Sequence, residues 1–123
     1  AQVITFVPMS ARKEAERGYN QSGLIAGGMG RALSLPCVTL LAERRGFRTQ
    51  RELGRTDRYI NVIDRYKAVN IKKIKHKTVI LVDDVFTTGA TINECSRQLL
   101  LNGAEKVYSI AVARADPENV DNI

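Results

Sequence analysis

The stretch VILVDDVFTTGAT, Val79 to Thr91, decides the fold of this chain. Its first four residues are apolar and mostly β-branched, which is typical of a strand buried on both faces of a parallel sheet. Asp83 and Asp84 follow at the carboxyl end of that strand. The next residues are almost all Thr, Gly or Ala, and apolar residues at helical spacing come after them. The pattern predicts a strand, a loop and a helix in succession.

Capping residues at both ends of that helix can also be recognised in the sequence. Thr91 and Glu94 have the spacing of a capping box, and Gly103 is suited to the position after the last turn. The apolar positions between them are Ile92, Cys95, Leu99 and Leu100. We therefore expect a helix over residues 91–102 that packs through this face.

The composition of the loop predicts an anionic ligand. Small residues ahead of a helix leave backbone N–H groups accessible, and the helix dipole favours negative charge there. The hydroxyls of Thr87, Thr88 and Thr91 would add donors, whereas Asp83 and Asp84 would accept hydrogen bonds from a sugar or share Mg²⁺ with the ligand. Each feature alone also fits ordinary turn chemistry, but their combination indicates a sugar phosphate.

Two other phosphate-binding patterns do not fit. The chain contains no GxxxxGK[ST] motif, which excludes a Walker A loop. The run AGGMGRAL has Leu33 where a dinucleotide fingerprint requires its third glycine, and no strand immediately precedes it. We interpret Gly28 and Gly30 as a site of close helix packing.

These residues carry a resemblance to the type I phosphoribosyltransferases. VILVDDVFTTGAT is similar to their signature, which is an apolar strand, two acidic residues, two further positions and Thr-Thr-Gly-x-Thr. VPMSARKEAERGYNQSGLIA, from Val7, and RTQRELGRTDRYINVIDRYKA, from Arg48, resemble the ComF branch of that superfamily. The resemblance implies an α/β fold with a central, mostly parallel sheet flanked by helices.

The resemblance also implies a ligand, phosphoribosyl pyrophosphate, and a cofactor, Mg²⁺. Asp83 and Asp84 would be the catalytic carboxylates and would hold the metal indirectly, through the ligand. The 5-phosphate would bind at Thr87, Thr88, Gly89, Ala90 and Thr91. The pyrophosphate would bind at Ser10, Ala11, Arg12 and Lys13. A mobile loop closing over the site would contribute Arg44, Arg45, Arg48 and Arg58.

The charge of the chain agrees with an anionic ligand. Nineteen Lys and Arg against 13 Asp and Glu give a net charge of +6. The basic residues gather in segments 12–17, 44–58 and 72–77. The first would face a pyrophosphate past a strand end, and the third is interpreted as a solvated turn. Arginines of the middle segment suit either a phosphorylated substrate or a nucleic-acid backbone, although few aromatic residues accompany them.

Length and composition predict one compact domain. The 123 residues are 44% hydrophobic and suffice for a single core, which we assign to residues 1–115 with a loose tail over 116–123. No long apolar run or signal-peptide pattern is present, so we expect a soluble cytoplasmic protein without membrane insertion. Cys37 and Cys95 are expected to be buried free thiols, with no protein-bound zinc. Proteins of the ComF branch carry an upstream zinc-binding segment, so the sequence is expected to be a fragment or a short variant.

The remaining elements follow from hydrophobic patterning. Strands are predicted over 3–8, 38–42, 66–70, 78–83 and 106–113. Helices are predicted over 20–33 and 91–102, with a basic turn after the first strand and a short helix in the segment up to residue 64.

Three functions are compatible with the sequence. The first is a phosphoribosyltransferase whose acceptor is unknown, related to competence and DNA uptake. The second is a non-catalytic accessory protein that handles single-stranded DNA. The third is a regulator that senses the sugar donor without turnover, and a homodimer is possible.

Overall fold

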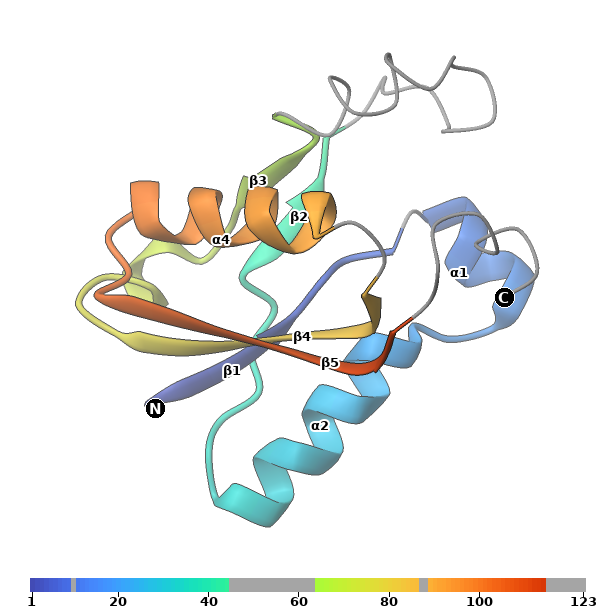
Figure 1. Cartoon of the computed structure of the whole chain (residues 1–123), viewed down its shortest axis with the longest axis horizontal. Helices are drawn as coiled ribbons and strands as arrows, with labels where there is room; N and C mark the ends of the chain where they lie inside the picture. The colour runs from blue at the N-terminus through green and yellow to red at the C-terminus, as the bar shows by residue number, and fades with distance from the viewer. Residues whose placement is uncertain (10, 45–63, 87–88, 115–123) are drawn as a thin grey trace.

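The computed structural model describes residues 1–9, 11–44, 64–86 and 89–114. Its main sheet has three parallel strands in the order β1-β4-β5: β1 (Val3–Phe6), β4 (Thr78–Phe86) and β5 (Lys106–Arg114). The helices are α1 (Ala11–Arg17), α2 (Gln21–Leu33) and α4 (Ala90–Leu101), with a short 3-10 helix η2 (Ile71–Lys73). Figure 1 shows α4 on one face of the sheet and α2 on the other. The predicted α/β fold with a parallel sheet is confirmed.

Two shorter strands form a separate pair. β2 (Leu41–Glu43) and β3 (Tyr66–Ala68) are antiparallel to each other. The predicted strand over 38–42 is therefore displaced, and residue 37 makes only an isolated parallel bridge to Ile4 of β1. The predicted strand over 66–70 ends earlier, because Asn70 adopts a left-handed conformation, with φ of 53°.

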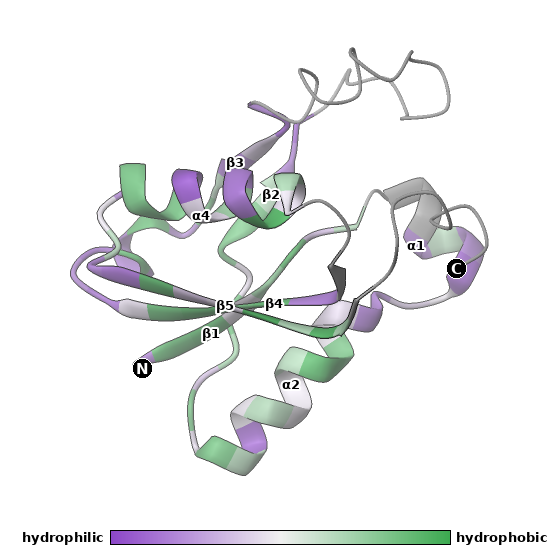
Figure 2. Cartoon of the chain, viewed as in Figure 1, coloured by the Kyte–Doolittle hydropathy of each residue, from purple (hydrophilic) through white to green (hydrophobic). Residues whose placement is uncertain are grey.

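The central strand is buried on both faces, as its unbroken apolar run predicts. Val79 and Leu81 pack into the layer beneath α4, where Cys95 and Leu99 are fully buried. Ile80 and Val82 face the opposite layer, together with Ile4 of β1 and Ala26 of α2. In Figure 2 the apolar colouring follows the middle of β4, whereas the turn ahead of it is hydrophilic. The strand thus separates two cores.

Two helix predictions need correction. The basic turn after β1 contains a helix, α1, because its alternation of Ala, Glu, Lys and Arg favours helix without an apolar stripe to signal it. Thr91 and Glu94 do not form a capping box, since α4 begins one residue before Thr91 with Gly89 at its N-cap. Leu100 is 49% exposed and does not belong to the packed face of α4.

The described cysteines differ from each other. Cys95 is buried, as predicted, but Cys37 is exposed on the connection between α2 and β2. Its neighbours on both sides, Pro36 and Val38, are also not buried, so an apolar residue type alone was a poor guide to burial in this connection.

Gly30 allows the chain after α2 to turn back against the helix. A Cβ atom at this position would lie 2.8 Å from the carbonyl oxygen of Leu35 and 3.5 Å from Cβ of Cys37. At Gly28 the nearest atom is the flexible guanidinium of Arg31, at 3.9 Å. The predicted close packing is therefore confirmed at Gly30 and not at Gly28.

This difference gives a matched pair of substitutions. Gly30→Ala is expected to lower the free energy of unfolding by about 1–3 kcal/mol, since a backbone oxygen blocks the new methyl group. Gly28→Ala is expected to raise it by roughly 0.5–1 kcal/mol, because alanine is the better helix former and has room. Urea unfolding of both variants measures the difference, and equal effects would contradict this account of α2.

Candidate functional site

The two aspartates lie half-buried in the central strand, at the end of the sheet where parallel strands place their ligands. β4 continues to Phe86, so the pair precedes the end of the strand rather than terminating it as predicted. Ser22 Oγ, in the first turn of α2, donates to Asp83 Oδ1 at 3.3 Å. The Asp84 N–H donates to Ser22 Oγ at 3.1 Å and to Asp83 Oδ1 at 2.9 Å.

Ser22 is therefore a site residue that sequence reasoning missed. It is only 4% exposed and lies 61 positions from Asp83, so no local motif connects the two. Asn20 positions its helical turn, because the Asn20 side chain accepts from the N–H of Gly23 at 3.2 Å and caps the helix. The cap, the serine and the acidic pair form one hydrogen-bonded unit.

The acidic pair has an unusual protonation equilibrium. The pKa of Asp83 is raised to about 6, first by burial and then by the side-chain hydrogen bond and like charge of Asp84, against the lowering effect of the hydrogen bonds from Ser22 and the Asp84 N–H. Burial likewise raises the pKa of the Cys95 thiol, and the charge of Asp83 adds to that effect. The Asp83 carboxylate is thus close enough to α4 to affect the charge of a group on that helix.

The start of α4 is the second part of the site. Gly89 is its N-cap residue in a left-handed conformation, with φ of 84°, which glycine adopts without strain. Ala90 and Thr91 begin the helix directly after it, and the Asn93 N–H donates to the Gly89 carbonyl at 2.8 Å. Thr87 and Thr88 lie outside the described residues. Three of the five predicted 5-phosphate residues are thereby placed at a helix start beyond the acidic strand.

The other predicted site residues are only partly placed. The first turn of α1, just past β1, contains Ala11, Arg12 and Lys13. The structure describes the backbone of these three residues but not their side chains. Arg44 follows β2 and is exposed, and its N–H donates to the Arg65 carbonyl at 2.7 Å. Ser10, Arg45, Arg48 and Arg58 lie outside the described residues.

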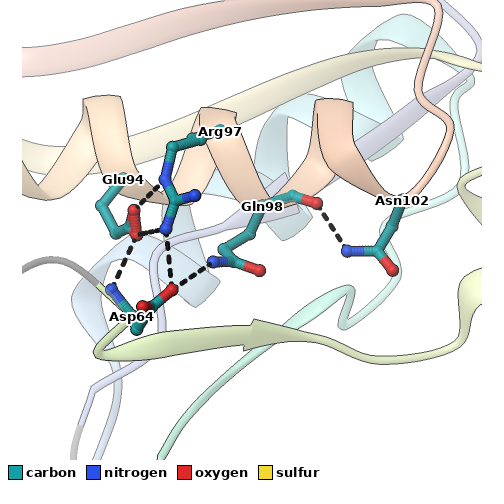
Figure 3. Close-up of polar contacts among 5 residues, drawn as sticks. All are labelled: Asp64, Glu94, Arg97, Gln98 and Asn102. Atoms are coloured by element: carbon teal, nitrogen blue, oxygen red, sulfur yellow. Dashed lines mark hydrogen bonds and ion pairs between the residues drawn. The ribbon is translucent and has the colours of Figure 1, made fainter.

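A polar cluster holds the chain at Asp64, where the predicted arginine-rich loop has ended (Figure 3). Glu94 of α4 accepts from the Asp64 N–H at 3.0 Å and from Arg97 Nε at 2.5 Å. Arg97 also bonds to the Asp64 carboxylate at 2.8 Å. Burial alone would raise the pKa of Glu94, but the hydrogen bonds from Arg97 and the Asp64 N–H outweigh it, so the pKa is lowered and the carboxylate stays ionised.

Arg65, the residue after Asp64, is held by a separate salt bridge to Glu43. Arg65 is 8% exposed, and its guanidinium bonds to Glu43 Oε1 through Nε at 3.3 Å and Nη2 at 3.1 Å. Since Glu43 belongs to β2 and Asp64 contacts α4, both ends of the predicted loop are connected to the folded core. Sequence reasoning missed these contacts because their partners lie more than twenty positions apart.

The basic segment 72–77 is a surface turn ahead of β4, as predicted. Lys72, Lys73 and Lys75 are exposed, at the amino end of the central strand. They are therefore separated along β4 from the acidic pair, and their charge is best explained by contact with water.

The described residues contain neither a ready-made metal centre nor a membrane-spanning helix. Within residues 1–9, 11–44, 64–86 and 89–114, no group of three or more His, Cys, Asp or Glu side chains could hold a metal ion. Among those residues, no helix is both long and apolar enough to cross a bilayer. A metal ion held at the acidic pair would consequently need further oxygen ligands, which a bound phosphate supplies.

The chain is similar in sequence to proteins with a phosphoribosyl transferase domain. The model of the phosphoribosyl transferase domain matches residues 21–122. Competence protein F of Haemophilus influenzae is 35% identical over 93% of this chain and 51% of its own length. The DNA utilization protein YhgH of Escherichia coli is 33% identical over 90% of this chain and 48% of its own length.

A solved structure shares the fold. The glutamine phosphoribosylpyrophosphate amidotransferase from B. subtilis, complexed with ADP and GMP, superposes with a TM-score of 0.62 at 24% identity. The match covers 91% of this chain and 22% of the amidotransferase. The chain spans about half the length of the curated relatives that it matches.

Proposed function

This chain belongs to the phosphoribosyl transferase domain family, as a ComF-type member, and from that premise we propose that it binds phosphoribosyl pyrophosphate with Mg²⁺ and transfers the phosphoribosyl group. The domain that does so is proposed to comprise residues 1–115. One observation supports the proposal above the others. The acidic pair of β4 and the start of α4 follow one another at the ligand-binding end of a parallel sheet.

Each part of this site has a role in the proposed reaction. The carboxylates of Asp83 and Asp84 accept hydrogen bonds from the ribose hydroxyls and stabilise positive charge that develops on the ring. The start of α4, from Gly89 to Thr91, binds the 5-phosphate through its backbone and the helix dipole. Arg12 and Lys13 bind the pyrophosphate from the segment after β1.

The reaction exchanges one bond at C1 of the ribose. The bond from C1 to the pyrophosphate oxygen breaks, and the electron pair leaves with pyrophosphate. A bond from C1 to the acceptor nucleophile forms in its place. Asp83 and Asp84 would hold Mg²⁺ indirectly, through the ligand, and the metal would supply positive charge for the leaving pyrophosphate. We propose that arginines of the segment 44–58, of which only Arg44 is described, serve to exclude water, because water would otherwise hydrolyse the donor.

Calorimetric titration of the purified chain with phosphoribosyl pyrophosphate and Mg²⁺ tests the proposal. We expect saturable binding that requires the metal. The absence of a binding heat at millimolar donor would reject the proposal. Binding without release of pyrophosphate, over a panel of acceptors, would instead support the donor-sensing regulator.

The affinity for the donor is expected to rise about tenfold between pH 5 and pH 7. The pKa of Asp83 is raised to about 6 by burial and by Asp84, so the carboxylate becomes fully ionised only across this interval. The same raised pKa means that ionisation of Asp83 reduces folding stability as the pH rises through 6. Phosphate groups of the donor titrate nearby, so Asp83→Asn serves as the control. An equal pH dependence in wild type and Asp83→Asn would contradict this assignment.

Handling of single-stranded DNA is the second candidate. The names of the relatives favour it, since two of them are a competence protein and a DNA utilization protein. If segment 44–58 follows the DNA backbone, the logarithm of the affinity is expected to fall with the logarithm of salt concentration, with a slope of roughly 0.7 per neutralised phosphate. Filter binding at several salt concentrations measures this slope.

A triple variant, Arg44→Ala with Arg45→Ala and Arg48→Ala, is the matched test of that segment. A steep slope that the variant loses would support the DNA-handling role. Equal, salt-insensitive binding by both proteins would exclude this segment as the DNA contact. Competition by the donor would show that the two anions share arginines.

A further inference from the structure

β5 is the outermost strand of the main sheet, and one of its edges is free among the described residues (Figure 1). The other edge pairs with β4 between Lys106 and Arg114. Apart from β4, no described segment bonds to the backbone of this strand. The outer edge of β5 therefore presents a row of N–H and C=O groups that a further strand could satisfy.

The middle of this edge strand lacks the features that keep sheet edges apart. Between Lys106 and Arg114 it reads VYSIAVA, without a charge, a proline or a glycine. Its register against β4 is unchanged from Thr78 to Phe86, so no bulge turns the strand away. Natural proteins usually protect an exposed edge by one of these devices. A long, uncharged edge is consequently expected to have a partner that covers it.

One face of the same strand is also uncovered. Tyr108 and Val112 are 55% and 62% exposed, and Ile110 between them is half-buried. These side chains are on the α2 side of the sheet, because Ile110 packs in the same layer as Ile80 and Val82. α2 packs chiefly against β1 and β4, whereas α4 covers the opposite face of β4 and β5. An unpaired edge and an exposed apolar face thus occur on one strand.

The charges at the ends of β5 select among the possible occupants. A second copy, added antiparallel along the full strand, would place Lys106 of one copy opposite Arg114 of the other. Like charges would then meet at both ends of the new pair, which opposes self-association. Lys77 is close to the start of β5, since its carbonyl oxygen accepts from the Glu105 N–H at 2.8 Å. The two lysines there outnumber Glu105, so a segment with carboxylates at this end is the better match.

We propose that the outer edge of β5 binds an extended segment of a partner protein, which adds a strand to the three-stranded sheet. The segment is antiparallel to β5, because antiparallel pairs form the more stable ladder. Its apolar side chains, at alternate positions, cover Tyr108 and Val112. Carboxylates at its C-terminal end lie beside Lys106. The interaction does not depend on the proposed transfer reaction, because neither the acidic pair nor the start of α4 takes part in it.

The test uses a synthetic peptide of alternating valine and threonine that ends in two aspartates and carries a dye at its N-terminus. Fluorescence anisotropy with the 123-residue chain measures its affinity, and amide hydrogen exchange followed by NMR locates it. We expect saturable binding that slows exchange at alternate amides of β5, those that face away from β4. Methylation of alternate peptide nitrogens is expected to abolish binding in one register and to preserve it in the other, because only one set faces β5.

A matched pair of variants tests the apolar face. Tyr108→Thr is expected to weaken peptide binding roughly fivefold to tenfold, since an aromatic cross-strand contact is lost. Tyr19→Thr removes a 46% exposed ring in the segment before α2 and is expected to leave binding unchanged. Val112→Thr, which nearly conserves the side-chain volume, replaces Tyr108→Thr if circular dichroism shows that this variant fails to fold.

A second pair tests the charge. Lys77→Gln with Lys106→Gln is expected to weaken binding roughly threefold at low salt, because exposed ion pairs are individually weak and are screened by salt. Lys67→Gln with Lys72→Gln removes the same charge from exposed positions on β3 and η2, and is expected to have no effect. A peptide that ends in two lysines is expected to bind less tightly than the aspartate peptide.

Three results would overturn the proposal. The first is no binding of the aspartate peptide at millimolar concentration. The second is binding without added protection of β5 amides, or with equal loss in both methylated peptides, because the peptide would then not be paired as a strand. The third is a dimer, detected by sedimentation velocity without peptide, whose formation protects β5, since the edge would then be covered by a second copy. Donor binding is measured separately by calorimetry, so its failure leaves the peptide titration interpretable.

Discussion

Replacing Asp83 and Asp84 together by asparagine is expected to weaken donor binding by about 1–3 kcal/mol, because hydrogen bonds to charged acceptors are lost. Ser22 and the backbone of the pair stay in place, so the change is confined to the carboxylate charge. Calorimetry with phosphoribosyl pyrophosphate and Mg²⁺ measures the loss. Unchanged affinity would mean that the donor binds elsewhere.

The control for this variant must remove the same charge. Glu16→Gln with Glu105→Gln neutralises two exposed carboxylates outside the site and is expected to leave the affinity unchanged. Both double variants make the chain more positive, so a purely general attraction for anions would tighten binding in each. Loss of affinity in the Asp83, Asp84 variant alone would locate the effect at the acidic pair. Folding should tolerate the change, since the raised pKa of Asp83 shows that its charged form is unfavourable there.

Leu81→Ala is expected to lower the free energy of unfolding by about 2–5 kcal/mol, since it leaves a cavity under a fully buried side chain. Leu81 lies in the middle of the central strand and packs in the layer beneath α4. A domain of this size is stable by only about 5–15 kcal/mol, so the variant would lose a large share of its stability. Urea unfolding followed by circular dichroism measures the change.

Leu101→Ala provides the comparison, because the Leu101 side chain is 66% exposed at the end of α4. Its effect is expected to stay within about 0.5 kcal/mol. If the two leucine variants were equally stable, the placement of β4 in the centre of the sheet would be wrong.

The parts of the fold that sequence predicted are those with a local signal. The run Val79 to Val82 has no polar interruption, and that alone places it between two cores. The acidic pair and the loop of small residues are contiguous in sequence, so their order along the chain fixed the strand, loop and helix start. α1 was missed because ARKEAER has no apolar stripe, and the side chains that the structure describes in this helix, residues 14–17, are all exposed.

The parts that sequence did not predict depend on contacts between distant segments. Nothing around Ser22 indicates that its hydroxyl will meet Asp83, and nothing around Glu94 indicates Asp64. The capping box was wrong for the same reason, because Glu94 bonds to the chain leading into β3 instead of closing its own helix. A four-residue motif such as a capping box indicates only which local contacts are possible. Tertiary contacts decided whether Glu94 capped its own helix or bonded to Asp64.

The pairing of β1 with β4 has a consequence for how the chain acquires its structure during synthesis. Val3 is opposite Val79, so β1 is synthesised well before the strand with which it pairs in the sheet. Contacts between such distant segments form slowly, because a long loop must close before any of them contributes free energy. The apolar segment of β1 consequently remains without its partner until β4 emerges, which makes it a natural binding site for chaperones on the nascent chain.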